Sequence, residues 1–437
     1  MSTQHETAYP LYTEVVNEFD KLTAAGRADK ARQTAFERFR LLGFPSIKHE
    51  DWKYTNITRF LKDEYALVPT VREIPAGLVE KATIPNLDCY QLVLVNGIWD
   101  GQVRGGNLPG GISIRRVNEA LRDPGTAALF ENGKWGNQHF ANLNAALFTD
   151  GLFITVDKGA DAAKPLHILH LYTTDHNLLV QPRHLWVVGA NAGLSVIEST
   201  VCTTTGEAKV WINGLTEIVA ASDARIDHVA IQTATAGTRL VQHTTVRQKK
   251  QSLYNNYTFT LPGADLVRND LQLRLEEDHT ETHLYGLYLT AGNQLVDNHT
   301  LVDHQKPFCF SNELYKGVLL EQSTGVFNGK VYVHKDAQKT NAFQQNNNLV
   351  IGKRATIDSK PELEIYADDV KCSHGSTVGQ FSEEALFYLR SRGIGEATAK
   401  ALLINAFAFD VTEKLKIGAV ETYINQLIRR HIPAEHA

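Results

Sequence analysis

The feature that most constrains this chain is a long stretch with almost no helical periodicity. Beyond Leu166, for about 200 residues, polar and apolar residues alternate in short segments bounded by Gly, Asn and Asp. The segments begin roughly every 12 to 16 residues, and they include 194–198, 210–214, 252–259 and 282–289. Many short strands at such spacing predict a mainly β domain, which could be a solenoid, a sandwich or a propeller.

Two observations favour a solenoid of the parallel β-helix type. The hairpin dipeptides Asn-Gly and Asp-Gly are scarce after Gly151 and occur only at 213–214 and 328–329, so tight antiparallel hairpins are not the general connector. The Asn-rich run 341–348 is typical of side-chain ladders at solenoid corners, where each amide bonds the coils above and below. Cys202 and Cys309 fall in predicted strands, and we interpret them as small core residues. We therefore expect a β-helix core over residues 88–375.

Both ends of the chain carry helical periodicity. Apolar residues recur at three- and four-residue spacing in 15–22 and 31–42, and Gly43 ends the second helix. The segment 48–54 reads as a loop whose Trp52 and Tyr54 anchor it to the next domain.

Further helices are predicted at 137–147 and, in the tail, at 382–392, 396–407 and 412–430. We expect mainly helical domains at 1–87 and 376–437 to cap the solenoid, because uncovered strand edges invite association.

Composition argues against several classes of function. A formal charge of -5 over 437 residues leaves no basic surplus for a nucleic-acid binder. The single Gly-Ile-Gly turn at 393–395, a possible DNA-backbone contact, is more simply a helix C-cap. No apolar run nears the ~18 residues of a membrane span, and the first residues lack the pattern of a signal peptide. The four cysteines are scattered, as expected for reduced thiols of a cytoplasmic protein.

Cys372 and His374 carry the strongest chemical signal, at the point where the β-rich region ends. In extended backbone, residues two apart point to the same side, so both could face one ligand or one partner surface. A thiolate and a neutral imidazole bind iron, zinc or copper, and exposure beside an imidazolium would lower the pKa of Cys372. Two ligands do not complete a site, so the pair suggests a half-site that something else completes. The alternative is a small buried cysteine beside a hydrogen-bonded histidine at a turn.

Four other histidines, at 279, 283, 299 and 304, are spaced four or five residues apart in pairs. In a helix this spacing could indicate metal ligation, but in strand and turn sequence such residues are roughly 13 Å apart. We expect His279, His283, His299 and His304 to lie at the surface or at corners.

An enzyme has weaker support. The sequence contains no HExxH, GxSxG or Walker A motif. A carbohydrate-active β-helix enzyme would need two carboxylates about 5 to 9.5 Å apart. Asp297, Asp303 and Glu313 are available, but nothing in their spacing selects them.

Two longer motifs point to a known family. The segment 361–379, PELEIYADDVKCSHGSTVG, and its continuation 384–394, EALFYLRSRGI, closely resemble the signature of the SufB/SufD family of the SUF iron–sulfur assembly machinery. The segment 43–55, GFPSIKHEDWKYT, is similar to the N-terminal motif of the SufD branch of that family.

The resemblance implies a right-handed parallel β-helix flanked by helical domains. It also implies a non-catalytic subunit of the SufBCD complex that pairs with SufB and supports iron acquisition. Cys372 and His374 match the family's Cys-x-His position, and His374 is the stronger ligand candidate. The iron–sulfur cluster would be transient and shared with SufB, which supplies the sulfur-receiving cysteine, and the isolated chain would hold no cofactor tightly. Without SufB the chain would form a homodimer.

The resemblance further implies that the C-terminal helices dock the ATPase SufC. Candidate contact residues lie in the first two tail helices: Leu386, Tyr388, Leu389, Arg390, Arg392, Leu402 and Phe407. A purely structural scaffold, in which Cys372 and His374 are only packed residues, remains the alternative.

Overall fold

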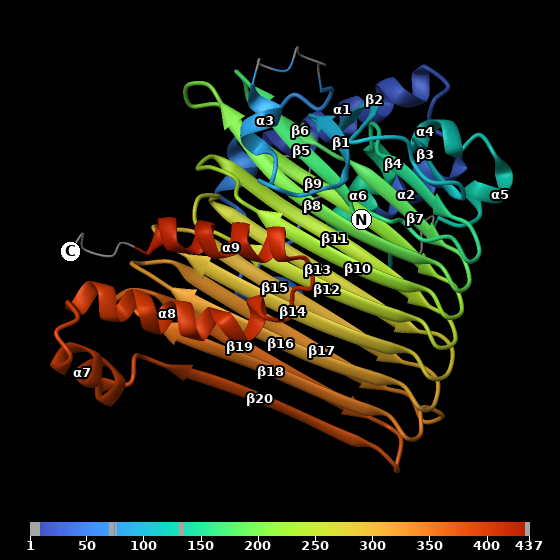
Figure 1. Ribbon diagram of the computed structural model, residues 1–437. Coiled ribbons are helices and arrows are strands. Elements are labelled where there is room, and N and C mark those ends of the chain that lie inside the picture. Colours follow the sequence, from blue (N-terminus) through green and yellow to red (C-terminus); the bar gives the residue numbers. More distant parts are fainter. Residues whose placement is uncertain (1–8, 70–73, 75–76, 131–134, 433–437) are drawn as a thin grey trace.

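The core of the molecule is a parallel β-solenoid (Figure 1). The computed structural model describes residues 9–69, 74, 77–130 and 135–432. Its strands are β1 (Tyr90–Val95), β2 (Ile98–Arg104), β3 (Ile112–Arg116), β4 (Leu152–Val156), β5 (Leu166–Thr174), β6 (Leu178–Val180), β7 (Arg183–Val188), β8 (Gly193–Thr204), β9 (Val210–Ala220), β10 (Arg225–Gln232), β11 (Thr238–Gln248), β12 (Leu253–Thr260), β13 (Leu266–Leu275), β14 (Glu281–Thr290), β15 (Leu295–His304), β16 (Phe310–Leu319), β17 (Thr324–Val333), β18 (Asn341–Val350), β19 (Thr356–Ile365) and β20 (Lys371–Gly379).

Successive strands alternate between two facing sheets, so each pair of strands completes one coil. Sheet A has the order β19-β17-β15-β13-β11-β9-β7-β4-β3, with β6 beside β9, and sheet B has the order β2-β1-β5-β8-β10-β12-β14-β16-β18-β20. Only β1–β2 and β3–β4 pair antiparallel among the paired strands of the described chain. The predicted mainly β, parallel solenoid is confirmed.

The supposed hairpin signals lie inside strands. Asn213–Gly214 falls within β9 and Asn328–Gly329 within β17, so neither of these dipeptides marks a hairpin. The Asn-rich run was predicted at a corner, and this is wrong: it forms strand β18. Alternate amides of that strand, such as Asn346 and Asn348, are buried in the interior and bond each other at 2.7 Å.

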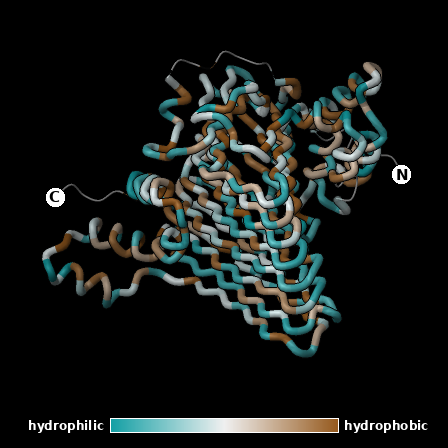
Figure 2. Tube along the Cα trace, turned by 45° about the vertical axis from the view of Figure 1, so that its right-hand side comes forward, coloured by the Kyte–Doolittle hydropathy of each residue, from teal (hydrophilic) through white to brown (hydrophobic). Residues whose placement is uncertain are grey.

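In six successive coils, one corner repeats the same backbone conformation. A single non-glycine residue with positive φ stands there, and its N–H donates to a backbone carbonyl at the same corner of the next coil. A left-handed residue turns the chain sharply, and the inter-coil bond satisfies a backbone group that would otherwise be unpaired. These corner residues are Asn191, Asp223, Gln251, His279, Phe308 and Lys339. Figure 2 shows mostly hydrophilic turns along this side of the solenoid.

The N-terminal helices cover the outer face of sheet A. Helices α1 (Pro10–Ala24), α2 (Lys30–Leu42) and α6 (His139–Leu147) form one apolar cluster with Trp211 and Leu266 of the sheet. The predicted loop at 48–54 contains a short 3-10 helix, η1 (Glu50–Trp52). Trp52 is buried with the Arg268 guanidinium 4.0 Å from its ring centre, whereas Tyr54 is 36% exposed. Trp52 anchors the segment as predicted, and Tyr54 does not.

The remaining short helices are η2 (Phe60–Lys62), α3 (Leu78–Ala82), α4 (Val117–Ala120) and α5 (Pro124–Ala127). No helix in the described part of the chain is both long and apolar enough to cross a membrane.

The C-terminal tail forms three helices, α7 (Glu383–Ser391), α8 (Glu396–Thr412) and α9 (Gly418–His431). Ser382 caps α7 by accepting the N–H of Ala385, as its sequence position predicts. Helix α8 runs past its predicted end because Ala408 and Val411 continue its buried stripe against sheet B. The third helix consequently begins at Gly418, later than predicted.

The helical regions lie along the outer faces of the solenoid and leave its C-terminal end uncovered. Strand β20 extends to Gly379, beyond the expected end of the core at 375, because its pairing with β18 continues that far. Each of β19 and β20 has a paired strand on one side only within the described chain. Figure 1 shows β20 at the lower edge of the molecule, with α7 projecting beyond it.

Candidate functional site

The uncovered end of the solenoid, which we call the open end, consists of β19 and β20. Cys372 is in register with Ala342 of β18, and His374 is in register with Gln344. Ala342 and Gln344 are both buried and face the solenoid interior. Because in-register residues of neighbouring strands share a face, Cys372 and His374 face the same side, as predicted.

The two side chains have different environments. His374 is exposed and makes no hydrogen bond to any described residue, because no further coil covers it. Cys372 is half-buried against an apolar cluster that includes Val333 and Ala342. Burial raises the pKa of the Cys372 thiol, so the predicted shift toward thiolate is wrong for this chain by itself. Both residues lie in a strand and not at a turn.

The described residues contain no group of three or more His, Cys, Asp or Glu side chains arranged to hold a metal ion. Cys372 and His374 therefore present a pair of possible ligands at an unpaired strand edge. Such an edge offers free N–H and C=O groups to an added strand. Chemically, the open end can pair with another chain and bring two soft or borderline ligands to the contact.

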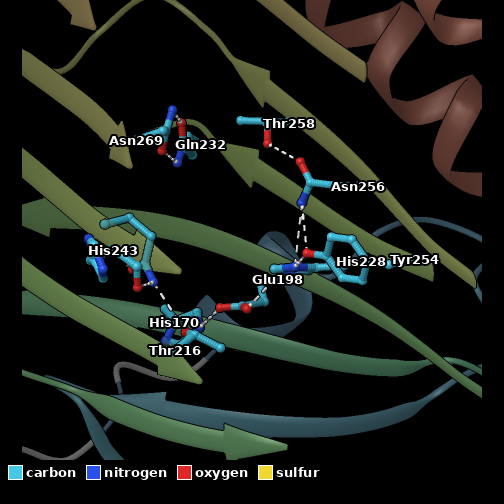
Figure 3. Close-up of polar contacts among 11 residues, drawn as sticks. His170, Glu198, Thr216, His228, Gln232, His243, Tyr254, Asn256, Thr258 and Asn269 are labelled. Atoms are coloured by element: carbon cyan, nitrogen blue, oxygen red, sulfur yellow. Dashed lines mark hydrogen bonds and ion pairs between the residues drawn. The ribbon is translucent and has the colours of Figure 1, made fainter. Parts of the chain in front are cut away.

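The sequence did not indicate a second polar group, the interior polar cluster, made by His170, Glu198, His228, Tyr254 and Asn256. Glu198 lies between the two histidines, which contact its two carboxylate oxygens at 2.9 and 3.0 Å (Figure 3). Burial alone would raise the pKa of Glu198, but these two hydrogen bonds hold it well below its usual range. His228 Nδ1 lies 3.0 Å from the Tyr254 hydroxyl.

The interior polar cluster borders an internal cavity of about 50 Å³. Both oxygens of Glu198 are engaged within the cluster, whereas Nδ1 of His170 is buried without a hydrogen-bond partner among the described residues. His184, also in the cavity wall, has its pKa lowered to about 3 by burial. The only sequence signal for this cluster is a charged residue at an inward position of an otherwise apolar strand, as in LSVIE at 194–198.

The three carboxylates considered for an enzyme do not converge. Glu313 points into the solenoid, where Thr300 and Gln344 donate to it at 2.7 and 2.9 Å. Asp297 is buried on the outer side of sheet A, where it pairs with Arg268. Asp303 lies six residues further along the same strand, roughly 20 Å away. This arrangement gives no support to paired acid–base carboxylates.

The predicted surface or corner positions of the four histidines are partly wrong. His279 is an exposed corner residue, but His304 is buried in the interior, 2.9 Å from the Ser311 hydroxyl, and burial lowers its pKa to about 3. His283 and His299 are half-buried on outer sheet faces. Cys309 is buried as predicted but lies in the turn before β16, not in a strand.

The C-terminal candidates for partner binding differ in accessibility. Helix α7 has no buried residue; its Tyr388 is 57% exposed, and the neighbouring Phe387 is 74% exposed. Leu402 of α8 is also exposed, whereas Phe407 is half-buried against the apolar cluster between the C-terminal helices and sheet B, where its ring and carbonyl contact the ammonium group of Lys316. Of the remaining candidates, Arg390 and Arg392 are exposed and Leu386 and Leu389 are half-buried.

Comparison with known proteins gives a consistent result along most of the chain. Residues 171–407 match the family model described as "SUF system FeS cluster assembly, SufBD core domain", and residues 3–168 match "SufBD protein N-terminal region". An iron–sulfur cluster assembly SufBD family protein of Synechocystis is 32% identical over 91% of this chain and 89% of its own length. The iron–sulfur cluster assembly protein SufD of Escherichia coli is 30% identical over 93% of each chain. SufD of Bacillus subtilis is 24% identical over 66% of each.

Proposed function

This chain belongs to the SufBD family of the SUF iron–sulfur cluster assembly system, and from that premise we propose that it is a non-catalytic scaffold subunit whose open end pairs with SufB. A role in iron–sulfur cluster assembly follows from the family. The pairing, the cluster ligand and the docking of an ATPase are our proposal.

The observation that carries the proposal is the combination of an unpaired strand edge with His374 on it. Strand β20 pairs with β18 on one side, and its other edge can receive a strand of SufB by β-augmentation. His374 then lies beside the contact, where SufB would contribute further ligands, including a cysteine. The cluster is cargo of this interface, and neither subunit alone would hold it tightly.

Sharing of ligands between subunits suits a cluster that must be released. A closed set of four cysteines in one chain would hold the cluster firmly. In the proposed site His374 is the principal ligand from this chain. Cys372 would contribute only after the partner or the metal lowers its pKa, since its half-buried position in the isolated chain favours the neutral thiol.

We further propose that the C-terminal helices dock the ATPase SufC through the exposed surface that includes Tyr388 and Leu402. Only residues 380–382 separate β20 from α7, so a displacement of α7 would act directly on the open end. ATP-driven dimerisation of SufC would thus loosen the SufB contact and expose His374. In the absence of SufB, the same strand edge would form a homodimer in the cytoplasm.

The test is co-purification of this chain with its native SufB and SufC, followed by anaerobic measurement of iron and labile sulfide. We expect a stable complex that takes up a cluster, with a lower yield for His374→Ala. Ser373→Ala is the matched control, because Ser373 is exposed on the same strand but faces the opposite side. The iron measurement also tests the family-implied support of iron acquisition.

The outcomes separate the alternatives. Equal cluster yield for wild type, Ser373→Ala and His374→Ala would leave this chain as a structural scaffold without a ligand role. Failure to form a complex with SufB would refute the pairing. Loss of SufC alone from a Tyr388→Ala, Leu402→Ala double variant, with SufB retained, would support the docking surface on the C-terminal helices.

A further inference from the structure

A row of three polar side chains leads from the interior of the solenoid to the open end. Glu313 of β16 is in register with Gln344 of β18, which in turn is in register with His374 of β20. Neighbouring strands are ~4.8 Å apart, and in-register residues share a face. The three side chains therefore stand next to one another, with His374 outermost.

The amide group of Gln344 is held in place from inside. Its Nε2 donates to Glu313 Oε2 at 2.9 Å, and Thr300 donates to the other oxygen of the same carboxylate at 2.7 Å. A Cβ atom added at Gly329 would lie 2.4 Å from Gln344 Nε2, so the glycine provides the space for the amide. With its NH₂ group donating to Glu313, the amide of Gln344 turns its carbonyl oxygen away from that carboxyl group.

This orientation leaves Gln344 Oε1 as a buried acceptor without a hydrogen-bond partner, in a side chain that is 1% exposed. A buried carbonyl oxygen is rarely left unpaired in a folded protein. The next side chain toward the open end is the imidazole of His374, which is a donor through whichever ring nitrogen carries the proton.

The coil that contains His374 offers no competing polar partner across the interior. Ser359 of β19 and Ser376 of β20 face each other with their hydroxyls 2.8 Å apart. The turn that joins β19 to β20 lies beyond this serine pair. Two residues closer to that turn, Pro361 of β19 stands opposite His374 of β20. Proline has no N–H and an apolar ring, so the polar neighbour of His374 comes from the coil beneath, as Gln344.

We propose that Gln344 is a positioning residue for His374: its Oε1 accepts the imidazole N–H when a partner covers the open end, and the other ring nitrogen is thereby directed outward as the metal ligand. This inference rests on the proposed function, since it requires His374 to bind metal. Glu313 and Thr300 act one step further back by fixing the amide of Gln344.

A fixed acceptor beside a metal-binding histidine has a known chemical effect. A histidine that binds a metal generally donates its other ring N–H to a fixed acceptor, which sets the tautomer and the ring orientation. Loss of such an acceptor typically weakens metal binding 10- to 100-fold. His374 stands on an edge strand with no other described contact, so its ring needs such a partner more than a buried histidine would.

The test uses the full complex of this chain with SufB and SufC, and Co²⁺ alone as a spectroscopic probe. We expect Gln344→Met, which keeps the length of the side chain but removes the acceptor, to bind Co²⁺ about 10- to 100-fold more weakly than wild type. Asn348→Leu is the matched control: it removes another buried, inward-facing amide of β18 that is in register with Val378 and not with His374. It should bind Co²⁺ like wild type, and thermal melting verifies that all complexes are folded.

A second readout reports the imidazole itself. Solid-state ¹⁵N spectra of the complex, with histidine labelled only in this chain and without metal, distinguish the two tautomers; His374→Gln identifies the signal. Wild type and Asn348→Leu should show one fixed tautomer for His374. Gln344→Met should show the mixture of tautomers typical of a solvated imidazole.

Three results would contradict the inference in distinguishable ways. If His374→Ala weakens Co²⁺ binding but Gln344→Met does not, the proposed function stands and the role of Gln344 is refuted. If Asn348→Leu weakens binding as much as Gln344→Met, the effect is general to buried amides of β18, and the specific role is refuted. If His374→Ala leaves binding unchanged, the ligand role of His374 is refuted together with the inference that depends on it.

Discussion

The buried carboxyl of Glu313 makes the stability of this chain depend on pH in a direction opposite to that of ordinary acid denaturation. Burial raises the pKa of Glu313 from 4.5 to about 7. Between these two values the folded chain keeps the proton while the unfolded chain releases it. The free energy of unfolding therefore falls as pH rises through this interval, and the loss is complete above the folded pKa. Glu313→Gln removes this dependence, because an amide does not titrate.

The magnitude follows from the two pKa values. One pH unit corresponds to about 1.4 kcal/mol, so the interval from 4.5 to about 7 is worth about 3 kcal/mol. The replacement amide retains both contacts: its oxygen accepts from Gln344, and its NH₂ donates to the hydroxyl of Thr300. In urea denaturation of the isolated chain from pH 5 to pH 8, we expect wild type to lose about 2 to 3 kcal/mol relative to Glu313→Gln.

The control is Glu207→Gln, at an exposed turn position, which should follow the wild-type pH profile. A constant m-value verifies that the variants unfold to comparable states. If wild type and Glu313→Gln lose the same stability between pH 5 and pH 8, Glu313 is not the titrating group and the raised pKa of its buried carboxyl is refuted. If the wild type instead becomes more stable than the variant as pH rises over this range, the hydrogen-bond partners stabilise the ionised Glu313 by more than burial destabilises it.

Two further predictions concern packing and charge. Gly317→Ala would place a methyl group 2.4 Å from the ring of Tyr288 and should lower the free energy of unfolding by about 1 to 3 kcal/mol. The control is Gly375→Ala, whose methyl group would meet no atom within 4 Å and should leave the free energy of unfolding nearly unchanged. Equal melting temperatures of the two variants would contradict the close packing at Gly317. Arg268→Met leaves Asp297 buried without its guanidinium partner and should lower the free energy of unfolding by about 3 to 5 kcal/mol, as measured by chemical denaturation. The double variant Arg268→Met, Asp297→Leu should recover part of that loss. If the losses of the two single variants simply add in the double variant, the pairing is refuted.

The sequence predicts the solenoid from two independent observations: short segments of alternating apolar residues recur along the chain, and hairpin dipeptides are scarce between them. It does not predict the place of the helices on the solenoid. Amphipathic periodicity shows that α1 and α2 bury one face, but not that this face meets Trp211 on the outer side of sheet A. The partner of an apolar stripe is set by tertiary structure, which a period in one segment does not contain.

The same limit applies to the interior polar groups. Period-two alternation marks which residues share a face, but when both faces carry polar residues it does not reveal which one is inward. Glu313 and His304 are buried in the interior, and the alternation in their strands did not reveal this; for Glu198 the only indication was a charge in the otherwise apolar segment 194–198. Cys372 illustrates a related limit: its polar neighbours in sequence predict exposure, whereas its neighbour in space is the apolar cluster around Ala342.

The open end itself contains an asymmetry that favours one of its two strands for pairing. Natural edge strands are protected from association by proline and by charged side chains. Strand β19 carries both, since Pro361 lacks an N–H and is flanked by Lys360 and Glu362. Strand β20 carries neither beyond its first residue, Lys371, and it is the strand that holds Cys372 and His374. The edge that lacks protection is thus the edge with the possible ligands, as expected if β20 is kept free for a partner and β19 is kept from competing for it.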